Sequence, residues 1–242
     1  MSMLSSIEDG YNTSYIDSLI ISLFYKTSTF NFFINSQPKD INIYYLQELF
    51  NKIIDLLKSN YIISSESINE IRNYSIYCGW QKDNNIINLF PVSEYYKFLI
   101  DKFNIKYIQV SNTLIPYIDI HFDNNNNDSN GLNLNILLEK YEINDENNII
   151  PIHINRNNFN IKIDIMKKIK LTNNKIAVFH SVICYSNINP HYYSIITDYN
   201  KDWYIHDSTI KPSINKITDI KDINISNKIK NECVMIFYKS FN

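Results

Sequence analysis

The spacing of apolar residues changes near residue 105 of this 242-residue chain, and that change limits the folds open to it. Before this point apolar side chains recur every three or four residues, which is the period of an amphipathic helix. After it they gather in short runs, rich in β-branched and aromatic residues and bounded by Asn, Asp and Pro, which is typical of strands. A helical first half and a strand-rich second half predict an α+β protein, in which helices pack on a mainly antiparallel sheet.

The two patterns also predict where the elements lie. Helices are expected after a polar turn within residues 8–25, and over residues 42–58, 64–77, 90–103 and 134–141. Strands are expected at "IKYIQV", "YIDIHF", "IIPIHIN", "KIAVFHSVICYS", "HYYSIITDY", "DWYIHDS" and "CVMIFYKS". The Asn-rich stretch at 123–131 is expected to be a loop. Because the chain has only three glycines, we expect Asn to occupy many turn positions that need a left-handed backbone.

Composition excludes several classes of function. The net charge of −2 gives no electrostatic case for binding nucleic acid. The sequence has no 18-residue apolar run that would predict a membrane span, and its first ten residues do not predict a signal peptide. The three cysteines, Cys78, Cys184 and Cys233, form no CxxC pair and so predict neither a disulfide framework nor a zinc site. We therefore expect an intracellular protein, cytoplasmic or nuclear, without metal or cofactor.

A possible base and its orienting group lie in the second half. Residues 189–210 predict two strands joined by a polar turn at Asn200, with His191 entering the first strand and Asp207 near the end of the second. An antiparallel pair of this kind can place the two side chains opposite each other. A carboxylate on one imidazole nitrogen would fix the tautomer and leave the other nitrogen as a base. The alternative is a chance approach of an edge histidine and a turn aspartate.

The matching nucleophile is less obvious. All three cysteines lie in or beside apolar runs and are expected to be buried and structural. Ser14 lies where the polar turn becomes a helix, and the positive end of a helix favours an anion there. The alternative for Ser14 is a simple N-cap. The other histidines are interpreted as structural groups with satisfied hydrogen bonds: His121, His153, His180 and His206.

Two segments resemble the catalytic boxes of ubiquitin-specific proteases. "YNTSYIDSLIISLFY" is similar to their cysteine box, with Ser14 standing where the family has its catalytic cysteine. "PHYYSIITDYNKDWYIHDS" is similar to their histidine box, and "VSEYYKFLIDKF", "IIPIHINRNNF", "AVFHSVICYSN" and "CVMIFYKS" resemble further family segments in the same order. The resemblance implies a papain-like fold in one catalytic domain over residues 1–242, with a thumb-like part to about 104 and a palm-like part from about 105.

The resemblance also implies roles for individual residues. Ser14 (in place of the cysteine), His191, Asp207 and Asn12 would form the catalytic group, and Tyr15, Asp9, Tyr192 and Trp203 would bind substrate. Asp9 stands where the family has an oxyanion-hole asparagine, and a carboxylate there would repel an oxyanion. The family's zinc-binding fingers would be reduced or absent, because no CxxC pair is present.

Serine at position 14 leaves three functions open. Because a hydroxyl is far less acidic than a thiol, we interpret Ser14 as a replacement introduced for a catalytic cysteine, with a naturally inactive relative as the alternative. The first function is a deubiquitinase, monomeric and acting on ubiquitinated substrates. The second is a protease for another ubiquitin-like protein, and the third is a pseudoenzyme that binds ubiquitin. The acidic residues Glu142, Asp145 and Glu146 would either face ubiquitin's basic tail or form a solvated loop.

Overall fold

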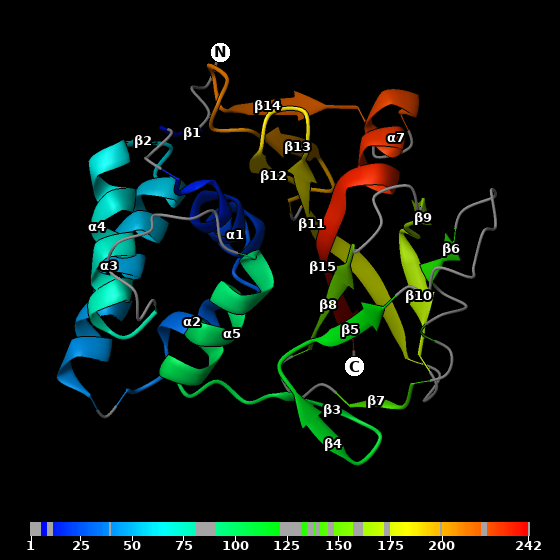
Figure 1. Ribbon diagram of the computed structural model, residues 1–242, viewed down its shortest axis with the longest axis horizontal. Coiled ribbons are helices and arrows are strands. Elements are labelled where there is room, and N and C mark those ends of the chain that lie inside the picture. Colours follow the sequence, from blue (N-terminus) through cyan, green and yellow to red (C-terminus); the bar gives the residue numbers. More distant parts are fainter. Residues whose placement is uncertain are drawn as a thin grey trace.

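The structure is a computed structural model that describes residues 6–8, 12–38, 40–80, 91–121, 132–134, 138, 141–144, 148–156, 162–171, 175–198, 200–218 and 222–241. The helices are α1 (Ser14–Phe24), α2 (Asn31–Ile34), α3 (Ile41–Lys58), α4 (Ser65–Tyr77), α5 (Val92–Lys102) and α7 (Ile223–Glu232). Helices α1 to α5 gather on one side of the molecule and most strands on the other, as Figure 1 shows. The expected α+β architecture is confirmed.

The main sheet has eight strands in the order β14-β13-β12-β11-β15-β8-β5, with β10 paired to β11. Its strands are β5 (Ile118–His121), β8 (Ile149–Asn155), β10 (Lys168–Lys170), β11 (Ile176–Ser186), β12 (His191–Thr197), β13 (Trp203–His206), β14 (Ile214–Ile217) and β15 (Cys233–Phe241). The pair β5–β8 is parallel, and the other pairs of this sheet are antiparallel. The sheet is therefore mainly antiparallel, as expected.

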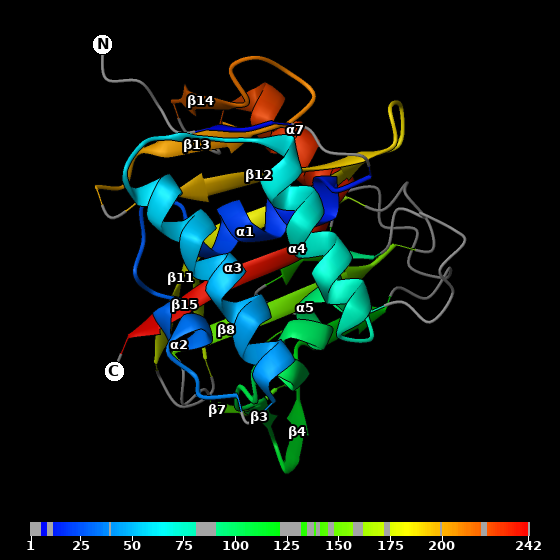
Figure 2. The same ribbon diagram turned by 90° about the vertical axis from the view of Figure 1, so that its left-hand side faces the viewer.

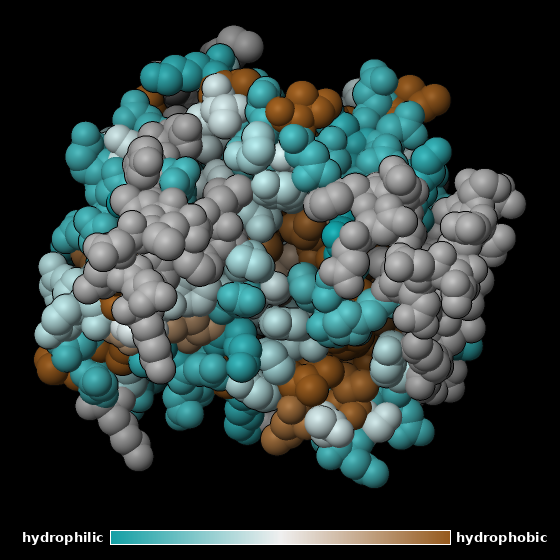
Figure 3. Space-filling model, in the orientation of Figure 1, coloured by the Kyte–Doolittle hydropathy of each residue, from teal (hydrophilic) through white to brown (hydrophobic). Residues whose placement is uncertain are grey.

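Short strands form three smaller sheets. They are β1 (Ser6–Ile7), β2 (Ile62–Ile63), β3 (Ile108–Val110), β4 (Thr113–Ile115), β6 (Leu132–Asn133), β7 (Ile143–Asn144) and β9 (Ile163–Asp164). The pairs are β1–β2 and β6–β9, and β3 pairs with both β4 and β7. In Figure 3 apolar side chains gather over the region of β3, β4 and β5, where Leu114 is exposed.

Helix α1 is the central helix of the fold. Figure 2 shows it between the sheet and the outer helices α3 and α4. It packs on β12 and β11 on one side and on α5, α3 and α4 on the other, so all of its residues are buried. Sequence spacing predicts an amphipathic helix, and the apolar face is buried as predicted. The polar face is buried too, because a helix enclosed by two layers has no side left for water: Asp17, Ser18 and Ser22 are inaccessible.

The outer helices begin close to the predicted positions. The Asp40 carboxylate caps α3 by accepting a hydrogen bond from the Asn42 amide at 2.8 Å, and Ser64 caps α4 by accepting from Ser67. Apolar side chains of α1, α3, α4 and α5 share one core cluster with residues of the sheet, such as Ile183 and Phe237. The helical half thus rests on the strands through one continuous apolar layer.

Several expectations fall outside the described residues or miss an element. The loop predicted at 123–131 lies outside them, and of the helix predicted at 134–141 only Leu134 and Leu138 are described in helical conformation. Helix α7 and strand β14 were not predicted. Across the described part of the chain, no helix combines the length and apolarity needed to cross a bilayer.

Candidate active site

The start of α1 carries the first candidate residue. Asn12 adopts a left-handed backbone with φ of 54°, and Thr13 follows as the N-cap. Ser14 is therefore the first helical residue and not the cap, so the alternative interpretation as an N-cap is wrong. The Thr13 hydroxyl donates to the buried Asp17 carboxylate at 3.3 Å. With 4% exposure, the Ser14 side chain lies at the positive end of a buried helix.

The hairpin β12–β13 carries the second and third candidates. His191 is the first residue of β12, and Asp207 directly follows β13. Their side chains meet, with His191 Nε2 3.2 Å from Asp207 Oδ2. The ladder pairs Ser194 with His206, so by extension Asp207 lies across from Tyr193 rather than His191. The predicted neighbours thus form a diagonal pair and not a directly opposed one, a distance that a long side chain can span.

The environment of Asp207 keeps it ionised. Burial by itself would raise the pKa of this carboxyl group, but hydrogen bonds from His191 and Thr209 outweigh burial and lower the pKa to about 2. Thr209 donates from its backbone N–H at 3.0 Å and from its hydroxyl at 2.6 Å to Oδ1, which leaves Oδ2 for the imidazole. The sequence analysis did not single out Thr209; the hint is a hydroxyl residue two positions after an aspartate, which is typical of an Asx turn.

The imidazole of His191 contacts acceptors through both nitrogens. Nδ1 lies 2.5 Å from the backbone carbonyl of Asn189, and Nε2 faces the Asp207 carboxylate. A carbonyl and an ionised carboxylate only accept hydrogen bonds, so both ring nitrogens donate. This geometry describes the imidazolium form, held against a carboxylate. To act as a base, the ring has to lose a proton from Nδ1 and release the Asn189 carbonyl.

Ser14 is linked to the His191–Asp207 pair through the backbone of β12. Its Oγ accepts a hydrogen bond at 3.1 Å from the N–H of Tyr192, the residue after His191, across a sequence separation of 178 residues. The start of α1 and the start of β12 are therefore adjacent, which is the convergence that the two sequence boxes predict. A direct approach of the hydroxyl to the ring stays a prediction.

The predicted substrate-binding residues lie in different environments. Tyr15 is fully buried: its hydroxyl accepts a hydrogen bond from Trp80 Nε1 at 3.1 Å, and burial raises its pKa to about 12. Tyr192 packs its ring on Tyr185 beside Ser14. Asp9 lies outside the described residues, as does Gly10 of the same turn. The place predicted for Asn12 in the catalytic group stays a prediction.

Trp203 does not lie beside Ser14, His191 and Asp207. It pairs with Thr197 at the far end of the hairpin from His191, and its ring packs on Phe179 in the second core cluster. Its sequence position only four residues before Asp207 suggests proximity. An extended strand, however, rises about 3.3 Å per residue, so the two side chains lie at opposite ends of β13. The structure therefore does not support a substrate contact by Trp203 next to His191.

The cysteines are buried as expected, and the remaining histidines have hydrogen-bond partners as expected, with one exception. All three cysteines are free and buried, and Cys184 pairs across the sheet with Cys233. His121 and His153 both contact the Asp119 carboxylate. His206 is also buried, but among the described residues neither of its ring nitrogens has a hydrogen-bond partner, so the expectation that its hydrogen bonds are satisfied is wrong. Within the described residues, no three side chains are grouped as metal ligands.

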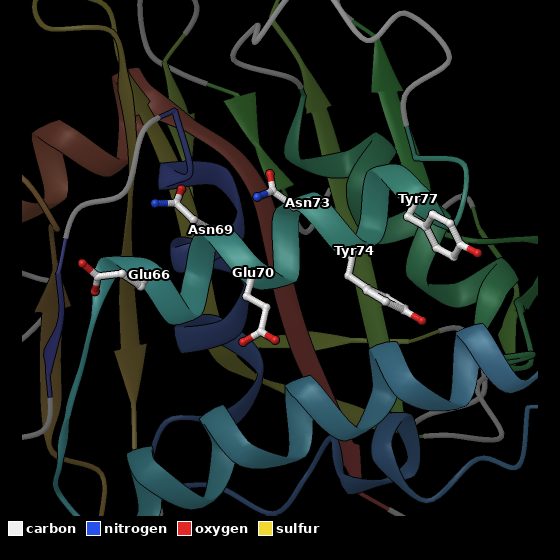
Figure 4. Close-up of a pocket in the computed structure, with 6 residues that line it drawn as sticks. All are labelled: Glu66, Asn69, Glu70, Asn73, Tyr74 and Tyr77. Carbon is white, nitrogen blue, oxygen red and sulfur yellow. The ribbon is translucent and has the colours of Figure 1, made fainter.

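A hollow of about 720 Å³ on the outer face of α4 is separate from this group. Figure 4 shows that its lining comes from a single helix: Glu66, Asn69, Glu70, Asn73, Tyr74 and Tyr77. None of the candidate catalytic residues lines it.

Comparison with solved structures identifies the fold. The chain superposes on the structure of the Ubp8-Sgf11-Sgf73-Sus1 SAGA DUB module with a TM-score of 0.61 and 11% identity, over 99% of this chain and 68% of that one. The SAGA Ubp8/Sgf11/Sus1/Sgf73 DUB module gives 0.62 and 9%, again over 99% and 68%. The same module bound to monoubiquitin gives 0.61 and 9%, over 99% and 70%. No family model and no curated protein matches the sequence.

The chain therefore shares the α+β fold of the chains in these DUB-module structures. More particularly, this fold is like that of the ubiquitin-specific proteases, as the sequence motifs predict.

Proposed function

We propose that this chain is a ubiquitin-related hydrolase domain, in which residue 14 occupies the position of the nucleophile, His191 that of the base and Asp207 that of its orienting acid. The observation that carries the proposal is the contact between two segments that are distant in the sequence. The Ser14 hydroxyl accepts a hydrogen bond from the Tyr192 amide, and the ring of the adjacent His191 is hydrogen-bonded to the Asp207 carboxylate. These are the two segments that resemble the catalytic boxes. A thiolate at position 14 would attack the carbonyl carbon of the modifier's terminal glycine and release the amine, and water would then hydrolyse the resulting thioester.

Each neighbour would have a defined part in that reaction. His191 Nδ1 would take the thiol proton and later return it to the leaving amine. The Asp207 carboxylate would hold the ring through Nε2 and stabilise its charged form. Backbone N–H groups at the start of α1 would face the developing oxyanion, because they are not used by the helix itself. The reaction needs no metal or cofactor.

The surroundings favour a basic peptide as the substrate tail. Burial raises the pKa of Tyr192, and the nearby carboxylate of Glu94, in the first turn of α5, adds to the rise. A second carboxylate, Asp119 of β5, contacts His153 at 2.9 Å on the neighbouring strand. Because Glu94 lies near both Tyr192 and the His153–Asp119 pair, these carboxylates would attract basic side chains in the tail of a modifier. Of the acidic residues expected to do this from sequence, Glu142 is exposed, while Asp145 and Glu146 lie outside the described residues.

Hydrolysis of a fluorogenic amide of the ubiquitin C-terminus tests the proposal. Ser14→Cys is expected to hydrolyse it, because the change restores a group of pKa about 8.5 that the helix N-terminus and an imidazolium lower further. The unaltered chain is expected to be inactive or nearly so. In the Ser14→Cys background, His191→Ala should abolish the activity.

Asp207→Asn in the same background provides a graded test. The amide oxygen can still accept from Nε2 but carries no charge to stabilise the imidazolium, so kcat should fall, by at most about 10⁴. KM should change little, because Asp207 lies behind the ring and not at the substrate. The control is Asp119→Asn, which should raise KM and leave kcat nearly unchanged. Equal kcat values for the Asp207→Asn and parent proteins would contradict the assigned role.

A specific observation also favours a second function, a binding protein that does not cut. The Ser14 hydroxyl is engaged by a backbone amide, and His191 Nδ1 by the Asn189 carbonyl, so the ring does not present a lone pair there. The unaltered chain is then expected to bind ubiquitin or a ubiquitin-like protein without turnover. Calorimetric titration of the unaltered protein and of the Ser14→Cys variant with ubiquitin, and with other ubiquitin-like proteins, distinguishes binding without turnover from hydrolysis and identifies the modifier.

A further inference from the structure

Helix α7 lies on the face of the main sheet opposite to the face on which α1 packs, as Figure 1 shows. Ile229 of α7 belongs to the second core cluster together with Tyr193 of β12, whereas Tyr192 belongs to the first cluster together with α1. Because side chains alternate between the two faces of a strand, His191 begins β12 on the face of Tyr193. The candidate base therefore has neighbours on the α7 side of the sheet as well as on the α1 side.

Tyr193 is buried and held at its hydroxyl end. The residue is 3% exposed, and its hydroxyl donates to Glu232 Oε2 at 2.6 Å, a distance typical of a hydrogen bond to an ionised carboxylate. Burial raises the pKa of Tyr193, and Cys184, the residue across from it in β11, and Glu232 add to the rise. The hydroxyl therefore stays protonated and remains a donor. The Lys228 ammonium lies 5.8 Å from the centre of the tyrosine ring, so a second residue of α7 lies beside Tyr193.

Glu232 is attached to a fixed backbone, because Arg156 binds the chain on both sides of it. Arg156 directly follows β8, and its guanidinium donates from Nη2 to the Lys230 carbonyl at 2.7 Å and from Nε to the Cys233 carbonyl at 2.6 Å. The Lys230 carbonyl is one of the last four of α7, which have no partner within the helix. The end of α7 is thus joined to the main sheet, and the carboxylate that holds Tyr193 has a defined position.

The ring of Tyr193 packs beside the imidazole of His191. The two ring centres are 6.1 Å apart and the planes are inclined by 39°, within the range of about 4.5–7 Å over which aromatic rings interact. To act as a base, His191 has to release the Asn189 carbonyl, and this step gives up one of the contacts that orient the imidazole. Packing against a buried, anchored ring remains in place during this step, as does the hydrogen bond to Asp207.

We propose that Tyr193 and Glu232 are positioning residues for His191, so that the end of α7 belongs to the candidate active site. This inference rests on the proposed function, in which His191 is the base. Glu232 fixes the tyrosine ring, and the ring keeps the imidazole aligned with the Asp207 carboxylate. Both residues act through His191 and take no part in making or breaking bonds. Without them the imidazole would leave its aligned position more often, and the step that depends on alignment would slow.

Hydrogen exchange in the unaltered Ser14 protein tests the proposal without requiring catalysis. The proton on His191 Nε2, which is hydrogen-bonded to Asp207, should give a downfield NMR signal that is assigned by its loss in His191→Gln. Tyr193→Leu should speed the exchange of this proton with water at least about tenfold, because the hydrogen bond opens more often. Glu232→Ala removes the anchor of the ring from a partly exposed position and should speed the exchange by a smaller factor.

Tyr238 provides the matched control. It is as buried as Tyr193 and belongs to the same core cluster, and its hydroxyl donates to the Met166 carbonyl at 2.8 Å. Tyr238→Leu should destabilise the fold much as Tyr193→Leu does, but should leave the exchange rate at His191 within about twofold of the parent value. Equal acceleration by the two variants, or none by Tyr193→Leu, would overturn the proposal. An unchanged rate in Glu232→Ala would overturn it even if Tyr193→Leu does not fold.

Kinetics in the Ser14→Cys background separates this inference from the proposed function. Tyr193→Leu should lower kcat by about 10–100-fold and leave KM within about twofold, because a misplaced base slows the chemical step and not substrate binding. Tyr193→Phe keeps the ring and should recover most of the loss. An unchanged kcat in Tyr193→Leu would contradict the inference alone. If the Ser14→Cys parent is inactive, the proposed function fails, and the exchange rates still decide whether Tyr193 positions His191.

Discussion

At the scale of single residues, the neighbours His206 and Asp207 differ sharply in their hydrogen bonding and in their charge. Asp207 has three hydrogen bonds and a pKa lowered to about 2. His206 points to the other face of β13 and is fully buried with both nitrogens unpartnered. Burial lowers its pKa to about 4, against a smaller opposing effect of Asp207. The histidine is therefore neutral and costs stability, while the aspartate is ionised and orients the ring of His191.

The two buried histidines predict loss of stability in mild acid. Burial also lowers the pKa of His180 to about 4. Both groups bind protons more readily in the unfolded chain, where a histidine has a pKa of about 6.5. Their contribution is thus complete above pH 6.5 and is lost as the pH falls toward 4. The free energy of unfolding should decline by up to about 2.7 kcal/mol per pH unit in this window.

Substitution of His206 separates its share from the rest. His206→Leu removes two unpartnered buried nitrogens at similar volume, so the free energy of unfolding at pH 7 should rise by about 1–3 kcal/mol. The decline between pH 6.5 and 4 should become about half as steep. Urea denaturation at several pH values measures both, with His121→Gln as the exposed control. An unchanged slope would show that His206 does not titrate on unfolding.

At the scale of elements, helices α3, α4 and α5 end in the same way. After α4, the Gly79 amide donates to the Ile76 carbonyl and the Trp80 amide to the Ser75 carbonyl, which is the Schellman motif. Helices α3 and α5 end with the same pattern at Asn60 and Asn104. All three residues have positive φ, so the expectation that Asn takes glycine positions is confirmed. The motif after α4 also delivers Trp80 to the Tyr15 hydroxyl, next to Ser14.

The effect of substitutions at these helix ends on the free energy of unfolding should depend on the backbone conformation and not on the space available for a side chain. An added Cβ at Gly79 would meet only the end of Lys102, at 3.8 Å, but φ of 95° disfavours any L side chain. Gly79→Ala should therefore lower the free energy of unfolding by about 1–2 kcal/mol. Asn60→Ala should also lower it, whereas Asn60→Gly should not. Chemical denaturation checks all three, and a neutral Gly79→Ala would contradict this account of the α4 end.

At the scale of the whole molecule, the apolar runs in the sequence predicted the long strands of the main sheet better than the short elements around it. The ranges expected for β8, β11 and β12 agree with the structure because long apolar runs between Asn, Asp and Pro leave little choice. Helix α7 was missed because it has only three apolar side chains, Ile223, Ile225 and Ile229, of which Ile229 alone is buried. The full burial of α1 depends on two layers that no local pattern contains.

The candidate site also has parts that the sequence predicted and parts that it did not. The sequence boxes predicted that the start of α1 meets the start of β12, and that His191 meets Asp207. They could not predict the diagonal register, since it depends on how the β12–β13 turn closes, nor the part of Thr209. The substrate-binding role of Trp203 came from the resemblance alone and stays a prediction, and the register of β12 with β13 places this residue at the other end of the strand from Asp207.

The most direct test of the central claim is the reaction of the Ser14→Cys protein with an electrophile attached to the C-terminus of ubiquitin. We predict one covalent adduct per chain, located at residue 14 by mass spectrometry and absent from the Ser14 protein and from Ser14→Cys/His191→Ala. Parallel probes built on other ubiquitin-like proteins show which modifier the site accepts. No adduct with any probe, from Ser14→Cys protein that is shown to be folded, would contradict the assignment of a hydrolase site to Ser14, His191 and Asp207.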